Sequence, residues 1–235
     1  TPSTACEVQA AIGAINAAAF DVNAACTGFM TALHTAYAYM AAGIYTTALV
    51  IGAETLSKIM DWDDRSTCVL FGDGAGAAMV KKDKTGLIRL VQGSDGEKGL
   101  NLCCKNRGNH HPFIEGDLHT YYTEMNGQEV YKFAVTKVPQ CIIEVLEQGN
   151  VTAEEVKYFI LHQANMRIIQ SVAKRLKVSE DKFPISLDTC GNVSAASIPI
   201  LLDKVNKEGL LKRGDKLVLA GFGGGLTWGA TVIEW

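Results

Sequence analysis

The chain has 235 residues, of which 48% are hydrophobic and 20% are charged, and its formal net charge is −3. This composition is typical of a globular protein that buries a large core, and it gives no reason to expect nucleic-acid binding. No run is long enough to span a membrane and no basic-then-apolar leader is visible, so we expect a cytoplasmic protein without membrane association. The seven cysteines are odd in number and irregularly spaced, which favours reduced thiols over a disulfide framework.

The first predicted elements lead to a cysteine. We expect a helix over Ala5–Ile15, a short buried strand over Ala19–Asn23, and an Ala-rich helix of about four turns that ends at Gly43. Cys26 lies in the turn before this last helix, where free backbone N–H groups and the helix dipole favour a thiolate and lower the thiol pKa. For this segment taken alone, a buried and inert cysteine is the alternative.

The next stretch predicts three strands, over Thr46–Ile51, Thr67–Phe71 and Ala77–Lys81, with a loop that begins at Ala53. The glycine run Gly72–Gly76 resembles a dinucleotide-binding fingerprint, but its spacing differs and a strand rather than a helix follows it. We therefore interpret it as a tight turn between antiparallel strands.

Two further segments contain cysteines and histidines that the prediction leaves out of the active site. His34 falls two turns after Cys26 in the predicted helix, and we expect it to be structural. Thiols and imidazoles from Cys103-Cys104 and His110-His111 suit zinc, but adjacent pairs cannot easily direct four side chains at one ion. We expect a solvated loop and no metal site there.

A strand over Gly86–Gly93 and a long amphipathic helix over Gly127–Glu147, interrupted near Pro139, are predicted next. The apolar segment from Tyr158 then runs directly into His162, and a helical pattern begins just beyond it. A histidine at the carboxyl end of a strand lies where open α/β sheets bind ligands. A hydrogen-bonded core histidine is the alternative.

The last predicted junction contains Asn192, in a Gly-Asn turn before a helix that begins with small and hydroxyl residues. An ordinary helix cap is the alternative for this residue. The chain closes with strands over Lys216–Ala220 and Thr231–Trp235, expected to form a hairpin around the Gly223–Gly225 loop. A Cys, a His and an Asn at three such junctions favour a shared catalytic site.

These motifs resemble the β-ketoacyl-(acyl carrier protein) synthase III family, the initiating condensing enzymes of bacterial fatty-acid synthesis in the thiolase superfamily. The matching segments, in family order along nearly the whole chain, are Asp21–Phe29, Phe71–Ala77, His162–Asn165, Gly191–Pro199 and Phe222–Trp228. The resemblance implies an α/β, thiolase-like layered αβαβα fold with two pseudo-symmetric halves. It also implies that the first half is truncated, with residues 1–85 as its remainder and 86–235 as a complete second half.

The resemblance assigns roles to individual residues. Cys26 would take an acyl group from an acyl-coenzyme A thioester, and decarboxylation of malonyl-acyl carrier protein would then generate a carbanion. His162 Nε2 and the Asn192 amide would donate to its enolate oxygen, while the backbone N–H groups of Cys26 and Gly224 would hold the second oxyanion. The product is a 3-oxoacyl-acyl carrier protein. No metal or other cofactor is expected, because coenzyme A enters as a substrate thioester.

Substrate and partner contacts are implied in the same way. Arg65 matches an arginine that lies against adenine, Asn165 a residue of the pantetheine tunnel, and Leu56 and Phe71 positions of the acyl pocket, which suits a short primer such as acetyl. The basic residues after His162 would dock the acidic acyl carrier protein; they are Arg167, Lys174 and Arg175. A homodimer is expected.

Asn192 separates this interpretation from related families. Elongating ketoacyl synthases use two histidines, thiolases use a second cysteine as a base, and a plant-type polyketide synthase differs from this chain after the histidine. Two alternatives remain: a homologue that transfers an acyl group to an alcohol or amine without condensation, and a non-catalytic remnant.

Overall fold

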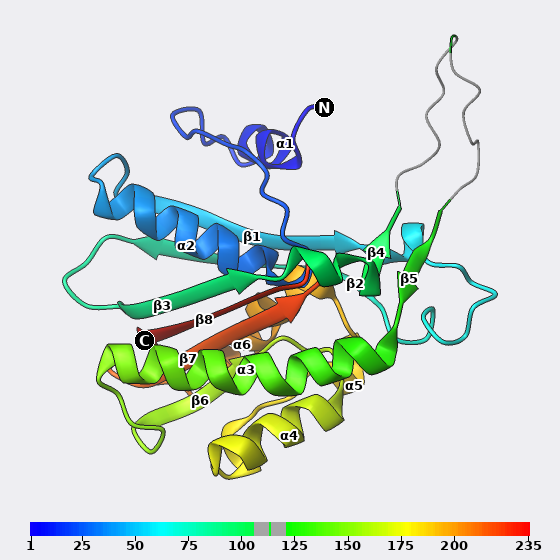
Figure 1. Cartoon of the computed structure of the whole chain (residues 1–235). Coiled ribbons are helices and arrows are strands. Elements are labelled where there is room, and N and C mark those ends of the chain that lie inside the picture. The colour runs from blue at the N-terminus through cyan, green and yellow to red at the C-terminus, as the bar shows by residue number, and fades with distance from the viewer. Residues whose placement is uncertain (106–112, 114–120) are drawn as a thin grey trace.

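The computed structural model describes residues 1–105, 113 and 121–235, and its elements form stacked sheets and helices (Figure 1). The helices are α1 (Thr4–Ala11), α2 (Gly28–Ala41), α3 (Gly127–Gly149), α4 (Met166–Leu176), α5 (Leu187–Cys190) and α6 (Ser197–Lys207). The strands are β1 (Thr47–Thr55), β2 (Asp73–Lys81), β3 (Leu87–Ser94), β4 (Leu102–Cys104), β5 (Thr123–Met125), β6 (Val156–Leu161), β7 (Lys216–Gly223) and β8 (Thr227–Glu234). Short 3-10 turns η1 to η5 cover Ala25–Thr27, Leu56–Ile59, Gly96–Asn101, Glu180–Lys182 and Ser194–Ala196.

A four-stranded sheet in the order β3-β8-β7-β6 forms the centre of the molecule. β6 and β7 run parallel, whereas β7–β8 and β3–β8 are antiparallel, so β7 and β8 form the predicted hairpin around the glycine loop. Successive side chains of β6 point to opposite faces: Phe159 and Leu161 join one hydrophobic cluster, and Ile160 joins the other. Because both faces are covered, this strand is almost entirely apolar.

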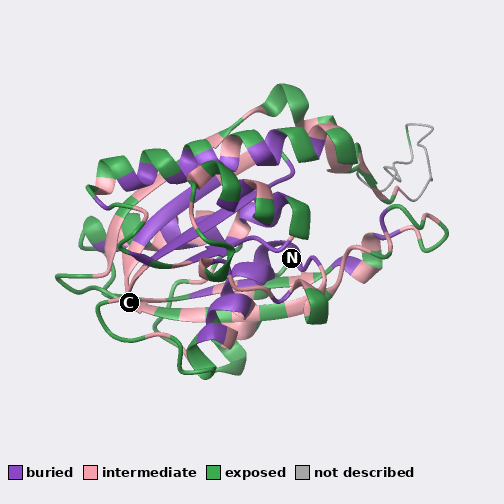
Figure 2. Ribbon diagram, turned by 90° about the horizontal axis from the view of Figure 1, so that it is seen from below, coloured by how far each residue is buried: buried purple, intermediate pink, exposed green. Residues whose placement is uncertain are grey.

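Helices cover the two faces of this sheet. α3 and α4 pack on one face, where their apolar residues join those of β6, β7 and β8. α2 and α6 cover the other face and are themselves covered by the two-stranded β1–β2 sheet (Figure 1). Figure 2 shows the buried strands enclosed by helices whose outer surfaces are exposed. The α/β fold is therefore confirmed.

Most long elements match their predictions. β3, α2 and α4 form where they were expected, whereas β7 continues to Gly223 and β8 already begins at Thr227, so both strands of the hairpin are longer than predicted. α3 is capped at its start by Asn126, whose side chain accepts the Glu129 N–H, and at its end by Asn150, which adopts a left-handed backbone conformation. It continues through Pro139 without the predicted interruption, and Pro139 is buried among the core residues of the helix. α1 is shorter than predicted and ends at Ala11.

Three local predictions are wrong. Residues 19–23 form no strand: Phe20 is 49% exposed, and the segment has no ladder to join in the described part of the chain. Residues 67–70 form turns, and Phe71 makes only an isolated bridge. The glycine run is not a turn, because β2 begins at Asp73 and pairs with β1, which itself extends through the predicted loop to Thr55.

The glycines of β1 and β2 allow α6 and η5 to approach the strands closely. A Cβ on Gly76 would lie 2.8 Å from the Ile200 backbone nitrogen, and one on Gly52 would lie 2.5 Å from the Ala195 carbonyl oxygen. Both distances are shorter than a carbon atom tolerates. The two-stranded sheet is therefore held against the turn that follows Asn192.

Replacing Gly52 by Ala should destabilise the protein. The added methyl group forces β1 away from η5, and overpacking of this kind costs about 1–3 kcal/mol. Urea unfolding of Gly52→Ala should show this loss, whereas Gly96→Ala should stay within about 0.5 kcal/mol of wild type, because a Cβ there meets no atom within 4 Å. Equal stability of the two variants would contradict the packing argument.

Candidate active site

Cys26 lies where the end of β7 meets the start of α2. It is the central residue of η1, is 5% exposed, and follows Ala25, whose φ is +45°. A Cβ on Gly223 would lie 2.6 Å from Cys26 Cβ and 3.0 Å from its Sγ. Only glycine lets β7 approach the thiol this closely.

The predicted lowering of the Cys26 pKa is wrong. Burial raises the pKa of the thiol to about 11, and the nearby carboxylate of Glu54 adds to the rise. The Ser194 side chain and the backbone N–H groups of Cys26 and Gly224 act in the opposite direction, because each stabilises the thiolate by hydrogen bonding. Desolvation outweighs these donors, so the resting group is a thiol.

The two backbone donors predicted for an oxyanion lie close to the sulfur. The N–H groups of Cys26 and Gly224 both act to lower the pKa of the Cys26 thiol. A Cβ on Gly224 would lie 3.1 Å from the Leu102 carbonyl oxygen and 3.4 Å from the Ala25 Cβ, so the loop is confined on both sides. These amides are fixed before any substrate arrives, as oxyanion stabilisation requires.

His162 directly follows β6, as predicted. Its backbone N–H donates to the Ala220 carbonyl at 2.8 Å, and its ring packs edge-to-face on Phe222, with centroids 5.1 Å apart. The ring is 1% exposed, and burial lowers its pKa to about 4, an effect that the Ser194 backbone partly opposes. The imidazole is therefore neutral near pH 7.

Ser197 determines which ring nitrogen of His162 carries the proton. Its Oγ lies 2.6 Å from His162 Nδ1 and 2.6 Å from the Ser194 carbonyl oxygen. While the single hydroxyl proton is donated to that carbonyl, Nδ1–H must donate to Oγ, and Nε2 then carries the lone pair. If the hydroxyl rotates to donate to Nδ1, Nε2 carries the proton and becomes a donor.

Asn192 is held by its backbone and by its side-chain oxygen. It forms a bridge with Phe71: its N–H donates to Leu70 at 2.9 Å, and its carbonyl accepts the Gly72 N–H at 2.9 Å. Its Oδ1 accepts the Ser194 N–H at 2.9 Å. With Oδ1 engaged, the amide NH₂ is the side chain's remaining hydrogen-bonding group, and it is a donor.

The three predicted catalytic residues are joined through Ser194, which the sequence analysis missed. Its N–H donates to Asn192 Oδ1, and its carbonyl oxygen accepts from Ser197 Oγ, which contacts His162 Nδ1. Its side chain acts to lower the pKa of the Cys26 thiol. The position of Ser194, two residues after Asn192, could have indicated that it belongs to the site. A serine before a helix, however, usually indicates only a helix cap.

The predicted substrate residues occupy different environments. Leu56 is buried in η2, and Phe71 is half-buried beside Asn192. Arg65 is exposed on the turn that Asp64 holds. Asn165 is exposed and caps α4, because its Oδ1 accepts the Arg167 N–H at 2.8 Å. A role in substrate binding stays a prediction for all four.

The predicted carrier-docking residues all lie on the exposed face of α4. Arg167, Lys174 and Arg175 are exposed, and none joins an ion pair within the described part of the chain. The positive charges therefore remain available to an acidic partner.

His34 has the structural role that was expected. Its ring is buried in α2 between Gln92 and Thr231, and Nδ1 lies 2.9 Å from Gln92 Oε1. The hydrogen bonds of both ring nitrogens are thus used within the fold.

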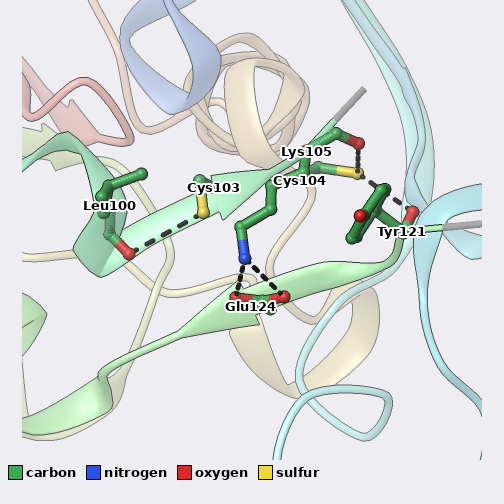
Figure 3. Close-up of polar contacts among 6 residues, drawn as sticks. All are labelled: Leu100, Cys103, Cys104, Lys105, Tyr121 and Glu124. Carbon is green, nitrogen blue, oxygen red and sulfur yellow. Dashed lines mark hydrogen bonds and ion pairs between the residues drawn. The ribbon is translucent and has the colours of Figure 1, made fainter. Parts of the chain in front are cut away.

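The paired cysteines occupy the β4–β5 hairpin, where Lys105 forms an ion pair with Glu124 (Figure 3). The two thiols are directed to different carbonyl groups: Cys103 to Leu100, and Cys104 to Tyr121 and Lys105. Among the described residues, no group of three or more side chains of the kinds that bind metals gathers anywhere. His110 and His111 lie outside the described residues.

Comparison with known proteins decides the family. The profile described as 3-oxoacyl-[acyl-carrier-protein (ACP)] synthase III matches residues 20–96, and the profile of its C-terminal part matches residues 146–235. The chain belongs to the 3-oxoacyl-[acyl-carrier-protein] synthase III family. A β-ketoacyl-[acyl-carrier-protein] synthase III from Clostridium acetobutylicum is 52% identical over 237 residues, covering all of this chain and 73% of the relative.

Solved structures agree with this assignment to the synthase III family. The 3-oxoacyl-[acyl-carrier-protein] synthase III of Aquifex aeolicus is 43% identical, with a TM-score of 0.92, and the match covers all of this chain and 73% of that one. The priming β-ketosynthase of the R1128 polyketide pathway is 33% identical, also with a TM-score of 0.92, and the match covers 100% of this chain and 70% of that one.

In the described part of the chain, no helix is long and apolar enough to span a membrane.

The lowered pKa of His162 predicts a loss of stability in acid. The pKa is about 4 in the folded protein, against 6.5 ordinarily, so between these values the unfolded chain binds more protons. The free energy of unfolding should therefore fall as the pH drops from about 6.5 to 4.

His162→Gln should make this fall shallower in urea unfolding at pH 7 and pH 5, because a neutral side chain cannot take up the proton. An NMR titration that places the His162 pKa near 6.5 in the folded wild type would contradict the prediction.

Proposed function

We propose that this synthase III family member condenses a short acyl-coenzyme A with malonyl-acyl carrier protein, giving 3-oxoacyl-acyl carrier protein and initiating fatty-acid synthesis. The observation that carries the proposal is the convergence of Cys26, His162 and Asn192 on the buried turn η5. Asn192 hydrogen-bonds Ser194, His162 is joined to the same turn through Ser197, and η1, which holds Cys26, packs against it. The full names of the relatives agree with this reaction.

The first step is acylation of Cys26. The sulfur attacks the thioester carbonyl, a bond forms between the sulfur and the acyl carbon, and the bond from that carbon to the coenzyme A sulfur breaks. Because the resting thiol has a raised pKa, its proton leaves as the new bond forms and passes to the departing coenzyme A sulfur, which leaves as the thiol. The N–H groups of Cys26 and Gly224 stabilise the oxyanion that develops on the acyl carbonyl oxygen.

The second step generates the nucleophile by decarboxylation. The malonyl C–C bond breaks, carbon dioxide leaves, and the electron pair delocalises onto the thioester oxygen. The Asn192 amide and His162 Nε2 donate to this oxygen, and for His162 this requires the arrangement in which Ser197 donates to Nδ1. No protein base is needed, because loss of carbon dioxide itself creates the carbanion.

The third step joins the two fragments. The carbanion attacks the acyl-cysteine carbonyl, the same backbone amides hold the second oxyanion, and its collapse releases the Cys26 thiolate. Coenzyme A thioester is a substrate here, and the mechanism uses no metal or other cofactor.

We further assign Arg65 to the adenine of coenzyme A, Asn165 to pantetheine, and Leu56 and Phe71 to an acyl pocket for a short primer such as acetyl.

Residues 1–85 form the half that holds the nucleophile, and residues 86–235 the half that holds His162 and Asn192. We place the enzyme in the cytoplasm as a homodimer. The exposed apolar side chains of the β1–β2 sheet, such as Met79 at 66% exposure, support an association through this region.

His162→Ala and Asn192→Ala should separate the two half-reactions. Each removes a donor to the enolate, so malonyl decarboxylation should fall about a hundred- to a thousand-fold, while acylation of Cys26 is largely spared. Radiolabelled carbon dioxide release and intact-mass detection of acyl-enzyme measure the two steps.

If both variants decarboxylated malonyl groups normally but no longer acylated Cys26, His162 and Asn192 would serve the acylation step instead. A wild-type protein that acylates Cys26 but never consumes malonyl-acyl carrier protein would instead be an acyltransferase without condensation, and one that does neither would be a remnant.

Charge reversal on α4 tests carrier docking. Lys174→Glu with Arg175→Glu should raise the KM for malonyl-acyl carrier protein and leave malonyl-coenzyme A turnover unchanged, because only the carrier presents an acidic surface. The wild-type carrier KM should also rise with salt. The matched control, Lys212→Glu with Arg213→Glu, changes charge in the loop before β7, at the opposite end of that strand from Gly223, and should have no effect. Equal losses with both malonyl donors would refute docking at α4.

A further inference from the structure

Two threonine hydroxyl groups meet between the turn that holds Cys26 and the start of β8. Thr27 directly follows Cys26 and is 2% exposed, and Thr227 is the first residue of β8. Their Oγ1 atoms lie 2.8 Å apart, although the two residues are 200 positions apart in the chain. This pair of residues, the threonine clamp, therefore joins the segment of the nucleophile to the central sheet.

Each hydroxyl of the clamp also lies close to a backbone carbonyl oxygen on its own side. Thr27 Oγ1 lies 2.7 Å from the Ala24 oxygen, and Thr227 Oγ1 lies 3.0 Å from the Gly224 oxygen. A hydroxyl has one proton, so two protons serve these three contacts. If neither proton lay between the hydroxyls, oxygen lone pairs would face each other at 2.8 Å. One hydroxyl therefore donates to the other, and the accepting hydroxyl donates to the carbonyl on its side.

The β8 end of this clamp is held rigidly. Thr227 pairs with Gly223 of β7 and with Ser94 of β3, so it lies in the central sheet with a strand on each side. The outer end of the glycine loop is fixed as well, because Asp95 and Leu226 exchange backbone hydrogen bonds of 2.7 and 3.0 Å. The glycine loop is thus tied to the sheet and to Asp95, and the clamp connects it to η1.

We propose that the threonine clamp positions the N–H groups of Cys26 and Gly224 relative to each other. Gly223 makes the first connection between the two segments, since a Cβ there would lie 3.0 Å from the Cys26 nitrogen. The clamp makes the second connection, between the residue after Cys26 and the end of the glycine loop. The catalytic meaning of this inference rests on the proposed function, in which the two amides stabilise an oxyanion.

The first test of the clamp needs no substrate. Thr27→Val and Thr227→Val each keep the shape of threonine but remove the hydroxyl. Because either valine breaks the bond between the hydroxyls, the double variant should lose little more stability in urea unfolding than the worse single variant. Hydrogen exchange of the Gly224 amide, followed by NMR, should be about ten-fold faster in each valine variant, because the loop opens more easily. Thr27→Ser and Thr227→Ser keep the hydroxyl and should exchange like wild type.

The second test measures the step that the two amides serve. Acetylation of Cys26 by acetyl-coenzyme A, followed by intact mass, should be about ten-fold slower at saturation in each valine variant, with an unchanged half-saturating concentration. This loss is smaller than the about hundred- to thousand-fold cost of removing an oxyanion donor, because the amides are displaced but still present. The double variant should be no slower than the single ones, and the serine variants should match wild type.

Thr35→Val is the matched control for this second test. It removes a hydroxyl whose hydrogen bond, to the Thr31 carbonyl oxygen at 2.8 Å, stays within α2. Acetylation should not slow in this variant.

Additive stability losses, or unchanged exchange of the Gly224 amide in the valine variants, would overturn the proposal. So would normal acetylation in valine variants whose Gly224 amide exchanges faster, because the clamp would then serve only the fold. If the wild type takes up no acetyl group, the proposed function fails, and unfolding and hydrogen exchange alone decide whether the clamp positions Gly224. Circular dichroism shows that the variants are folded, and the single variants carry the exchange and acetylation tests if the double variant does not fold.

Discussion

The site depends on the contact between the end of β7 and Cys26. Gly223 brings the β7 backbone against the thiol so closely that a single methyl group would lie 2.6 Å from Cys26 Cβ. This contact brings the Gly224 N–H close enough to lower the pKa of the thiol, and it joins η1, which holds Cys26, to the sheet in which β6 directly precedes His162. The geometry of the whole site follows from this approach of two backbones.

Burial shifts the pKa values of the Cys26 thiol and the His162 imidazole in opposite directions. It raises the pKa of the Cys26 thiol to about 11 and lowers the pKa of the His162 imidazole to about 4, so both are neutral at rest. A neutral pair avoids leaving charges in a dry site, where an unpaired charge is costly. In the proposed mechanism, the site stabilises charge only as it develops, through amide and imidazole donors that are fixed beforehand, and this is the arrangement that lowers a reaction barrier.

The sequence predicted that Cys26, His162 and Asn192 lie together better than it predicted the local structure around them. These three residues could be singled out because their motifs are short and local. The Gly72–Gly76 run was misjudged because its glycines serve packing against α6 rather than a turn, and that information lies in residues more than a hundred positions away. The direction of the Cys26 pKa shift was wrong for the same reason: the helix start is visible in the sequence, whereas the burial that outweighs it arises from distant segments, of which β7 is one.

The position of Ser194 in the site could not be predicted from the sequence pattern. Its backbone has a positive φ and hydrogen-bonds Asn192 and Ser197, and a serine near a helix start reveals neither feature. The fold class could be predicted because alternating apolar strands and amphipathic helices determine layers, but the order β3-β8-β7-β6 is set by long-range pairing.

The central claim is that Cys26 receives the acyl group. Incubation with acetyl-coenzyme A followed by peptide mass spectrometry tests it most directly, with Cys26→Ser as the comparison. One acetyl group should appear on the Cys26 peptide of the wild type, be removed by hydroxylamine, and be absent from the variant. Acetylation of another cysteine, or none on a folded wild-type protein, would contradict the account.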